Sequence, residues 1–411
     1  MKHAACRFCS APLTVTYADL GMSPPSNAYL AAEDLGRVER FYPLHAWVCD
    51  KCFLVQLEQF ETPEEIFSDY AYFSSYSDSW LAHAARYAEV MRERFGIGRE
   101  SFVVEIASND GYLLKNFVAH GVPVLGIEPA ANVAAVAEKI GVSTLVKFFG
   151  ESLASELAAA GKQADLIAGN NVLAHVPDLN DFVRGLKVLL KPGGVVTMEF
   201  PHLLRLMQEN QFDTIYHEHF SYFSFLVVQR VFASHGLTLF DVDELPTHGG
   251  SLRIYARHEA NEALAVSGKV TELLSRERSA GLDRIATYSS FAEGVKATKR
   301  SLLKFLIGAK ESGKRVAAYG APAKGNTLLN YCGVRSDFLE YTVDRSPHKQ
   351  GRFLPGVHVP IHAPERILET RPDFVLILPW NLKEEVMEQM RSVRSWGGRF
   401  VVPIPETRVL D

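Results

Sequence analysis

Apolar and polar residues alternate along the middle of this chain in a way that predicts strands and helices in turn. The pattern is clearest in the segment FVVEIASNDGYLLKNFVAHGVPVLGIEP, which begins at Phe102. Short apolar runs predict buried strands, Ser-Asn-Asp-Gly is turn chemistry, and apolar positions three and four apart predict a helix that Gly121 ends. The expected elements are a strand at 102–106, a turn at 108–111, a helix at 112–120 and a strand at 122–127.

The same alternation extends on both sides of this segment. We expect helices at 78–95, 131–140 and 179–190, strands at 143–146, 164–168 and 195–200, and a strand pair at 237–242 and 252–256. A charged helical stretch at 267–312, with breaks at Gly281 and Gly294, leads to further strands at 315–319, 340–343, 374–378 and 399–402. Strands that alternate with helices predict mostly parallel sheets covered on both faces. The expected fold class is α/β, with a small N-terminal domain at 1–77, a Rossmann-like domain at 78–265 and a second Rossmann-like α/β domain at 266–411.

Composition limits the classes of function. The 411 residues are 47% hydrophobic and carry a formal net charge of −5, which predicts a full core and argues against a nucleic acid as the main partner. No apolar run approaches the ~20 residues of a membrane helix. The first residues, MKHAACRFC, lack the apolar segment of a secretory signal. We therefore expect a cytoplasmic protein without a membrane partner, of undetermined oligomeric state.

The turn after the first strand is the expected cofactor site, because ligands of open parallel sheets bind outside the carboxyl ends of strands. Glu128, at the tip of the next strand, can accept both hydroxyls of a ribose. NAD and FAD need G-x-G-x-x-G, so that the backbone approaches a pyrophosphate. Here the turn has Ala107 and Gly111, with Asn109 and Asp110 between them. A polar turn with one glycine suits the zwitterionic methionine of S-adenosylmethionine better, although the pattern also admits another nucleotide.

Four of the five cysteines form two C-x-x-C pairs, Cys6/Cys9 and Cys49/Cys52. Two such turns supply four thiolates in a tetrahedral set, which suits zinc. Two disulfides, or four core cysteines, are the alternatives, and disulfides fit poorly without a secretory signal. Because four ligands leave no coordination position for a substrate, the expected zinc site is structural. Cys332 stands alone and is expected in the core.

Ionisable and aromatic side chains gather at Tyr216, His217, Glu218 and His219. A metal site, a proton-transfer site and a surface polar cluster are the three interpretations. The two histidines would diverge on a helix, and an i, i+4 pair is missing. A proton-transfer site needs His or Glu near a reacting carbon, with a phenol that donates to developing charge. The apolar flanks of this cluster favour the proton-transfer site.

A second glycine turn, GAPAKGNT, opens a helix at residues 320–327. Backbone N–H groups and the helix dipole at such a turn attract an anion. The turn does not meet the Walker A pattern G-x-x-x-x-G-K-[ST]. The chain therefore combines one site that suits a sulfonium cofactor with another that suits a phosphorylated or nucleotide-linked substrate.

Ordered motifs run through the whole chain: the two C-x-x-C pairs, Y-A-Y-F-S-S, V-E-I-x-x-N-D-G, G-I-E-P, N-x-L-A-H-V-P, F-D-x-I-Y-x-E-H-F, T-H-G-G-S-L-R and Y-G-A-x-A-K-G-N. In this order they resemble the S-adenosylmethionine-dependent sugar C-methyltransferases of deoxysugar biosynthesis, including that of antibiotics. The resemblance implies methylation of C-3′ of a nucleotide-linked 4-keto-deoxyhexose. Ala107 departs from the pattern, because a glycine is common there, and His217 stands at a position that the motif leaves open.

The resemblance also implies a role for each matching residue. The expected cofactor contacts are Glu105, Ala107, Asn109, Gly111, Glu128 at the ribose, Phe149 near the adenine and Asn171 near the methionine. The expected substrate contacts are His248, Gly249, Lys324 and Asn326, the last two at the diphosphate of a dTDP-linked sugar. The residues expected around the reacting carbon are Tyr72, His175, Tyr216, Glu218 and His219. His219, oriented by Glu218, would remove the C-3′ proton, and Tyr216, His175 or Tyr72 would donate to the oxyanion at C-4′.

Three other functions stay open from the sequence. An O- or N-methyltransferase acting on a phosphorylated small molecule would not exchange substrate C–H protons with solvent. A zinc-ribbon nucleic-acid methyltransferase or binding module would bind RNA or DNA in a salt-sensitive way. An oxidoreductase that uses the C-terminal Rossmann-like unit would bind NAD.

Overall fold

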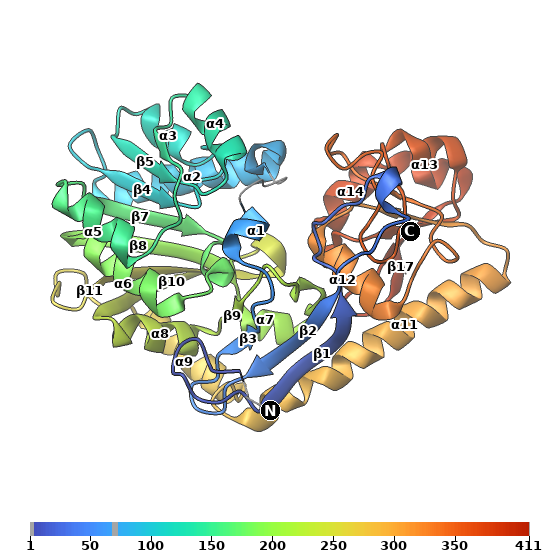
Figure 1. Cartoon of the computed structure of the whole chain (residues 1–411), viewed down its shortest axis with the longest axis horizontal. Helices are drawn as coiled ribbons and strands as arrows, with labels where there is room; N and C mark the ends of the chain where they lie inside the picture. The colour runs from blue at the N-terminus through green and yellow to red at the C-terminus, as the bar shows by residue number, and fades with distance from the viewer. Residues whose placement is uncertain (1–3, 68–72, 411) are drawn as a thin grey trace.

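The computed structural model describes residues 4–67 and 73–410. Two α/β lobes stand side by side, a large lobe built on a seven-stranded sheet and a small lobe built on a six-stranded sheet (Figure 1). A four-stranded N-terminal sheet lies at the base between them. The α/β fold class expected from the sequence is confirmed.

The large lobe has the strand order β10-β11-β8-β7-β4-β5-β6. Its strands are β4 (Val103–Ile106), β5 (Val124–Ile127), β6 (Thr144–Leu145), β7 (Ala164–Asn170), β8 (Leu190–Pro201), β10 (Leu237–Leu245) and β11 (Ser251–His258). The pairs among β4 to β8 are parallel, while β11 runs antiparallel to both β8 and β10. The strand order reverses at β4, which lies between β5 and β7. A ligand crevice is therefore expected at the carboxyl ends of β4, β5 and β7.

Helices cover both faces of this sheet. One face packs against α2 (Asp78–Phe95), α3 (Leu114–Val118) and α4 (Ala131–Lys139), and the other against α5 (Glu151–Ala159), α6 (Leu179–Leu189), α8 (Phe225–Ser234) and α9 (Gly268–Ser279). Ser77 caps α2 by accepting the Trp80 N–H at 3.3 Å, and Gly96 ends it with φ 64°. Both are ordinary helix end signals. Helix α3 is shorter than the expected 112–120, because the cofactor turn extends through Leu113.

The N-terminal sheet has the order β1-β2-β3-β9, with β1 (Val15–Ser23), β2 (Tyr42–Val48), β3 (Val55–Leu57) and β9 (Ser221–Tyr222). Strand β9 follows directly after the Tyr216–His219 segment and pairs antiparallel with β3. The N-terminal sheet therefore holds one end of that segment in place. A short helix, α1 (Pro63–Phe67), begins after Thr62, whose hydroxyl and N–H contact the Glu65 carboxylate at 3.1 and 2.8 Å.

The small lobe has the order β14-β13-β12-β15-β16-β17, parallel except for β17. Its strands are β12 (Val316–Tyr319), β13 (Thr342–Val343), β14 (Ile361–His362), β15 (Phe374–Ile377), β16 (Arg399–Val402) and β17 (Arg408–Leu410), and its helices are α12 (Ala323–Cys332), α13 (Glu365–Thr370) and α14 (Lys383–Gln389). The turn between β12 and α12 contains the GAPAKGNT sequence. Helix α12 lies on the side of the small lobe next to the large lobe (Figure 1), and its Thr327 hydroxyl donates to the Ile215 carbonyl oxygen at 3.1 Å.

Helix α11 (Phe291–Glu311) runs beneath the small lobe and shares one hydrophobic core with it and with β1. The expected break at Gly281 is present, since this residue has φ 83° between α9 and α10 (Ile285–Ser289). The expected break at Gly294 is wrong, because this residue lies inside α11. A Cβ there would lie 3.2 Å from Oδ1 of Asn210, so Gly294 instead allows close approach of the segment after α7 (Leu203–Gln208).

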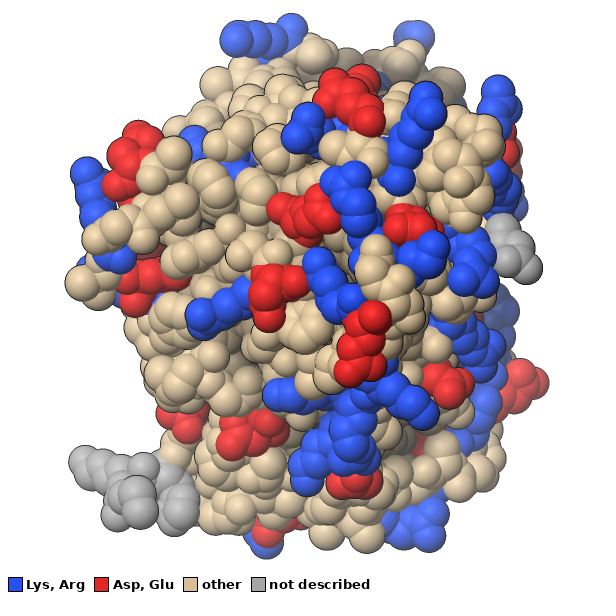
Figure 2. Space-filling view, turned by 90° about the vertical axis from the view of Figure 1, so that its right-hand side faces the viewer, with Lys and Arg blue, Asp and Glu red and all other residues tan. Residues whose placement is uncertain are grey.

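Positive and negative side chains are interspersed over the face that carries the small lobe (Figure 2). This mixture agrees with the nearly balanced totals of 43 basic and 48 acidic residues. Among the helices of the described residues, none is both long and apolar enough to span a membrane.

Candidate active site

The cofactor turn links β4 to α3 through three residues in the left-handed region. Ala107, Asn109 and Gly111 have φ values of 55°, 48° and 77°. Ala107 therefore takes the conformation of the glycine that is common there, at a cost of roughly 1 kcal/mol. Gly111 disfavours a side chain, since a Cβ would lie 3.1 Å from Cγ2 of Val142 and the backbone has a positive φ.

Glu128 ties this turn to the tip of β5. Its Oε2 accepts the Asn109 N–H and its Oε1 accepts the Ala130 N–H, both at 2.9 Å. Burial raises the pKa of Glu128, and the two N–H donors oppose that rise. Each carboxylate oxygen keeps a further lone pair, so Glu128 can still accept ribose hydroxyls. Glu105 lies fully buried below the turn, where burial raises its pKa well above the ordinary value and Tyr112 opposes the rise.

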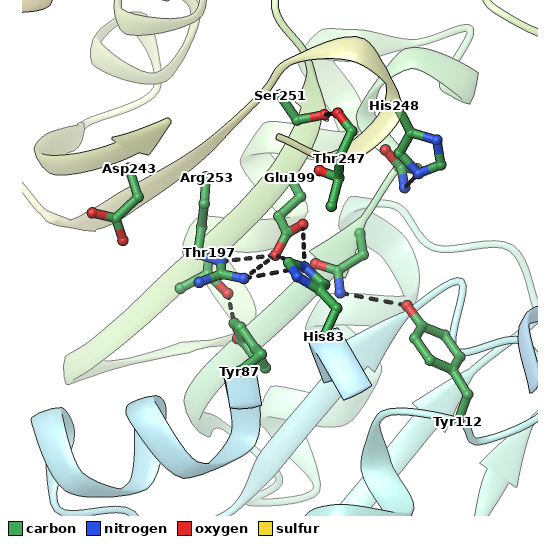
Figure 3. Close-up of polar contacts among 12 residues, drawn as sticks. His83, Tyr87, Tyr112, Thr197, Glu199, Asp243, Thr247, His248, Ser251 and Arg253 are labelled. Carbon is green, nitrogen blue, oxygen red and sulfur yellow. Dashed lines mark hydrogen bonds and ion pairs between the residues drawn. The ribbon is translucent and has the colours of Figure 1, made fainter. Parts of the chain in front are cut away.

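Two amide side chains, those of Asn170 and Asn171, stand at the tip of β7, and they contact Tyr112 and His248, which Figure 3 labels. The Asn170 Nδ2 donates to the Tyr112 hydroxyl at 3.4 Å, and the Asn171 Nδ2 lies 3.1 Å from the His248 Nε2. Burial lowers the pKa of His248 to about 4, so its neutral imidazole accepts this bond. The Oδ1 atoms of Asn170 and Asn171 have no hydrogen-bond partner among the residues that the structure describes. Two buried acceptor oxygens thus fit a ligand with N–H donors, such as the methionine ammonium of the expected cofactor.

A buried ionic network supports the tip of β8 (Figure 3). The His83 Nε2 lies 2.9 Å from Oε2 of Glu199, and the Arg253 Nε donates to Oε1 at 2.8 Å. Burial raises the pKa of Glu199, but His83 and Arg253 outweigh it and hold the pKa below its ordinary value. Sequence reasoning missed this network, although Glu199 stands near the carboxyl end of a predicted strand, the same signal that marked Glu105. Trp80 stacks on His83 with ring centroids 4.9 Å apart.

Tyr216 and His219 form a hydrogen-bonded couple beside this edge of the sheet. The Tyr216 hydroxyl lies 2.8 Å from Nε2 of His219, and Nδ1 of His219 lies 2.9 Å from the Thr214 carbonyl oxygen. A carbonyl can only accept, so Nδ1 carries the proton and Nε2 is the basic nitrogen. Burial, assisted by the neighbouring His175, lowers the pKa of His219 well below its ordinary value. His219 is therefore neutral at physiological pH and able to accept a proton.

The expected role of Glu218 is wrong in one respect. Both ring nitrogens of His219 are taken by Thr214 and Tyr216, so Glu218 does not orient that ring through a hydrogen bond. Oε1 of Glu218 instead accepts from Nδ2 of Asn27 at 2.6 Å, which joins the segment to a loop of the N-terminal region. Asn27 was also missed by sequence reasoning, because 191 residues separate the two partners.

His175 and His217 lie on opposite sides of the segment. The ring of His175 meets the ring of His219 edge-on, with centroids 4.7 Å apart. Burial lowers the pKa of His175 to about 4, against the hydrogen bond to the Glu218 carbonyl. His217 contacts the Pro43 carbonyl oxygen at 3.3 Å and packs edge-on against Tyr42. His217 and His219, the two histidines of the segment, thus diverge, as expected. Tyr72 lies outside the described residues.

The remaining expected contacts occupy distinct surroundings. Phe149 is partly buried, with its ring edge-on to Phe182 at 5.4 Å. Lys324 donates from Nζ to Oδ1 of Asn381 at 2.9 Å. Asn326 is fully buried, and its Oδ1 lies 3.2 Å from Nδ2 of Asn330. Gly249 has φ 89°, and a Cβ there would lie 2.7 Å from the ring of Trp380. The cofactor or substrate contacts of these residues stay predictions.

The four cysteines of the two C-x-x-C pairs come together at one point. Cys6 and Cys52 have their Sγ atoms 3.5 Å apart, as do Cys9 and Cys49, and all four Sγ atoms lie within 4.8 Å of one another. Zinc–sulfur bonds of about 2.3 Å in a tetrahedron place sulfurs roughly 3.8 Å apart, so the arrangement fits the ion. Each pair is followed by a residue with positive φ, Ser10 and Phe53.

This cysteine cluster is continuous with the large lobe. Arg7, between the first two cysteines, donates to the carbonyl oxygens of Leu57 and Pro177 at 2.6 and 2.5 Å. Asn180 of α6 donates to the carbonyls of Arg7 and Phe8. Because Pro177 follows closely after His175, the metal cluster supports one wall of the active site.

Comparison with known proteins decides the family. Residues 6–67 match the family model of a zinc binding domain, residues 80–242 that of a methyltransferase domain, and residues 246–405 that of a C-methyltransferase C-terminal domain. The chain is 36% identical over 406 residues to the C-methyltransferase NovU of Streptomyces niveus, covering 99% of this chain and 96% of that protein.

This chain belongs to the C-methyltransferase family.

Solved methyltransferase structures match less than half of this chain, at low identity. Magnesium protoporphyrin IX methyltransferase (ChlM) from Synechocystis PCC 6803 with bound SAM is 13% identical and covers 44% of this C-methyltransferase and 81% of its own chain, with a TM-score of 0.33. An S-adenosylmethionine-dependent methyltransferase from Mesorhizobium loti is 14% identical. The match covers 43% of this C-methyltransferase and 100% of the other chain, with a TM-score of 0.35.

The family and the geometry together assign S-adenosylmethionine as cofactor and zinc as structural metal of this C-methyltransferase. The expected zinc-binding domain and the expected methyltransferase activity are confirmed. The residues that fit the cofactor are the turn after β4, Glu128 and the two amides at the tip of β7.

Replacing Glu128 by alanine is expected to weaken S-adenosylmethionine binding by about 10- to 100-fold. The change removes a charged acceptor of two backbone N–H groups and of the ribose hydroxyls, and hydrogen bonds to charged groups contribute about 1.5–3 kcal/mol. Titration calorimetry with the cofactor measures this loss. The control is Glu156→Ala, which removes an exposed carboxylate paired with Lys147. Equal affinity of the Glu128 variant and wild type would show that the ribose binds elsewhere.

Proposed function

We propose that this C-methyltransferase methylates C-3′ of a dTDP-linked 4-keto-deoxyhexose in deoxysugar biosynthesis. The Tyr216–His219 couple, with Nε2 of a neutral imidazole 2.8 Å from a phenol, carries the proposal. Methylation at carbon requires a nucleophilic carbon, and a sugar carbon becomes nucleophilic when a neighbouring ketone makes its C–H acidic. Such a reaction needs a base at the carbon and a donor at the ketone oxygen.

His219 is suited to be the base. Its Nδ1–H is fixed on the Thr214 carbonyl, so the ring cannot rotate without losing a buried hydrogen bond. Its pKa is lowered by burial, so it is deprotonated before substrate arrives. The Tyr216 hydroxyl donates to Nε2. When the C-3′ proton approaches Nε2, this hydroxyl is released to donate to developing negative charge, a role that His175 and Tyr72 can share.

The cofactor supplies an electrophilic methyl group on a sulfonium. The chain's part is to hold the reacting carbon in line with that group, and effective alignment contributes several orders of magnitude to rate. The amides at the tip of β7 and Glu128 would fix the cofactor from the large lobe. The α12 end of the small lobe, which faces the same edge, would hold the nucleotide.

The nucleotide-linked sugar rests on three observations. The relative over nearly the whole length is named a C-methyltransferase. A second Rossmann-like sheet, with a glycine turn at its first strand, suits a nucleotide-type ligand. The ordered motifs of the chain resemble those of the sugar C-methyltransferases.

A transfer reaction with ¹³C-methyl-labelled S-adenosylmethionine and a dTDP-4-keto-2,6-dideoxyhexose, or its 3-amino analogue, tests the proposed function. The expected product shows the labelled methyl coupled to C-3′ by NMR. A labelled methyl on oxygen or nitrogen would replace the proposal by O- or N-methylation. An unmodified sugar, with tight cofactor binding retained, would mean a different acceptor.

A further inference from the structure

Lys324 lies at a junction between the two lobes. It stands in the first turn of α12, where its ammonium lies 4.9 Å from the centroid of the Trp380 ring and 2.9 Å from Oδ1 of Asn381. A cation over an indole face is attracted by the ring quadrupole. The small lobe thus fixes the position of the ammonium before substrate binds.

Trp380 connects this ammonium to the proton-transfer segment of the large lobe. Its Nε1–H donates to Oδ2 of Asp213 at 2.7 Å, and its ring packs against Gly249. Asp213 immediately precedes Thr214, whose carbonyl holds His219. Lys324, through one aromatic ring, is therefore placed beside the active-site segment.

The ammonium keeps donors to offer. Lysine has three N–H groups, and one is used by Asn381. Among the described residues, Lys324 forms no ion pair within 4 Å. Asp213 is fully buried, and its Oδ1 has no hydrogen-bond partner among those residues. Burial is the largest cause of the lowered pKa of His219, His175 is the next, and the Lys324 charge also lowers that pKa. Burial is likewise the largest cause of the lowered pKa of His248, and the Lys324 charge is the next. The Lys324 ammonium therefore lies within electrostatic range of both imidazoles.

We propose that the Lys324 ammonium donates to the ketone oxygen of the substrate and stabilises the oxyanion formed when His219 removes the neighbouring proton. This inference rests on the proposed function, and it moves Lys324 from the diphosphate, where sequence reasoning placed it, to the reacting end of the sugar. The ketone carbon C-4′ is bonded to C-3′, whereas the diphosphate is attached to C-1′, on the opposite side of the sugar ring from C-4′. A cation linked through Trp380 and Asp213 to the segment that holds the base is therefore placed nearer to the ketone oxygen than to the diphosphate.

The step balances within the residues named. The C-3′–H bond breaks, and its proton moves to Nε2 of His219. The electron pair forms a double bond between C-3′ and C-4′, and the carbonyl π pair moves onto the oxygen. Lys324 keeps its proton and donates a hydrogen bond to that oxygen throughout. Asp213 acts through Trp380 as a positioning residue.

The test uses Lys324→Met, which keeps the length of the side chain and removes the charge, and Lys324→Arg, which keeps the charge. The control is Lys299→Met, which removes another ammonium placed over a ring of the same lobe, that of Tyr331 at 4.7 Å. Two quantities are measured with each full-length variant: deuterium exchange at C-3′ of the dTDP-4-keto sugar in D₂O, and the Kd for dTDP alone. S-adenosylmethionine affinity reports whether each variant is folded.

Lys324→Met is expected to slow exchange by about 10²–10³-fold, the effect of losing one preorganised oxyanion donor. Lys324→Arg keeps part of the rate, and dTDP binds all variants as it binds wild type. Weaker dTDP binding by Lys324→Met with normal exchange at saturating sugar would overturn the inference in favour of a diphosphate contact, with the proposed function intact. Absence of exchange by wild type would overturn the proposed function and this inference together.

Discussion

Replacing His219 by asparagine is expected to lower the turnover number by about 10²–10⁴-fold, the usual contribution of a positioned general base. Asparagine keeps an N–H donor for the Thr214 carbonyl, but it has no basic nitrogen where Nε2 stands. The cofactor contacts proposed at the tips of β4, β5 and β7 do not involve this side chain. S-adenosylmethionine affinity should therefore stay close to that of wild type while methyl transfer is nearly lost, as steady-state kinetics and calorimetry would show.

His217→Asn is the matched control for this prediction. It changes a buried imidazole two residues away, which contacts the Pro43 carbonyl and packs against Tyr42 rather than facing His175. The control variant should keep most of its turnover, with a modest loss of stability. Near-normal turnover of the His219 variant would refute its role as the base, and equal losses in both variants would indicate a structural effect.

Replacing Cys49 by serine is expected to remove the zinc and to lower the free energy of unfolding by about 4 kcal/mol or more. Loss of a structural metal belongs to the few changes of that size. The cluster anchors Arg7 and Asn180 against the loop after His175, so turnover should fall as well. Metal content by mass spectrometry and a chemical denaturation curve measure the two effects.

Cys332→Ser separates this effect from the loss of any buried thiol. Cys332 is buried in α12, far in sequence from the cluster, and burial raises the pKa of its thiol to about 12. Its replacement should keep one zinc per chain and cost only about 1 kcal/mol or slightly more, for burying a hydroxyl. Retention of full zinc and stability by the Cys49 variant would contradict the four-thiolate site.

Local patterns predicted the parts of the site that depend on neighbouring residues. The turn after β4 and Glu128 lie within one strand-helix-strand unit, so hydrophobic period and turn chemistry predicted their positions in the fold, while their contacts with the cofactor stay predictions. The cysteine pairs are recognisable because each C-x-x-C turn is local and chemically specific. The α/β class followed from alternation alone.

Contacts between distant segments could not be predicted in this way. The partners of Glu218 and Asp213, Asn27 and Trp380, lie 191 and 167 residues away from them. Glu218 stands next to His219 in sequence, yet its carboxylate contacts the N-terminal region, because neighbouring residues outside helices point in different directions. Gly294 was expected to break a helix, but its lack of a side chain serves close packing against Asn210.

The central claim is that a substrate carbon is deprotonated before it receives the methyl group. The direct measurement is mass spectrometry of a dTDP-4-keto-2,6-dideoxyhexose incubated in D₂O with the enzyme and S-adenosylhomocysteine in place of the methyl donor. Wild type is expected to introduce one deuterium at C-3′, and His219→Asn is expected to introduce none. Absence of deuterium at C-3′ with wild type, when the same enzyme still methylates this sugar from S-adenosylmethionine in a parallel reaction, would contradict deprotonation before transfer.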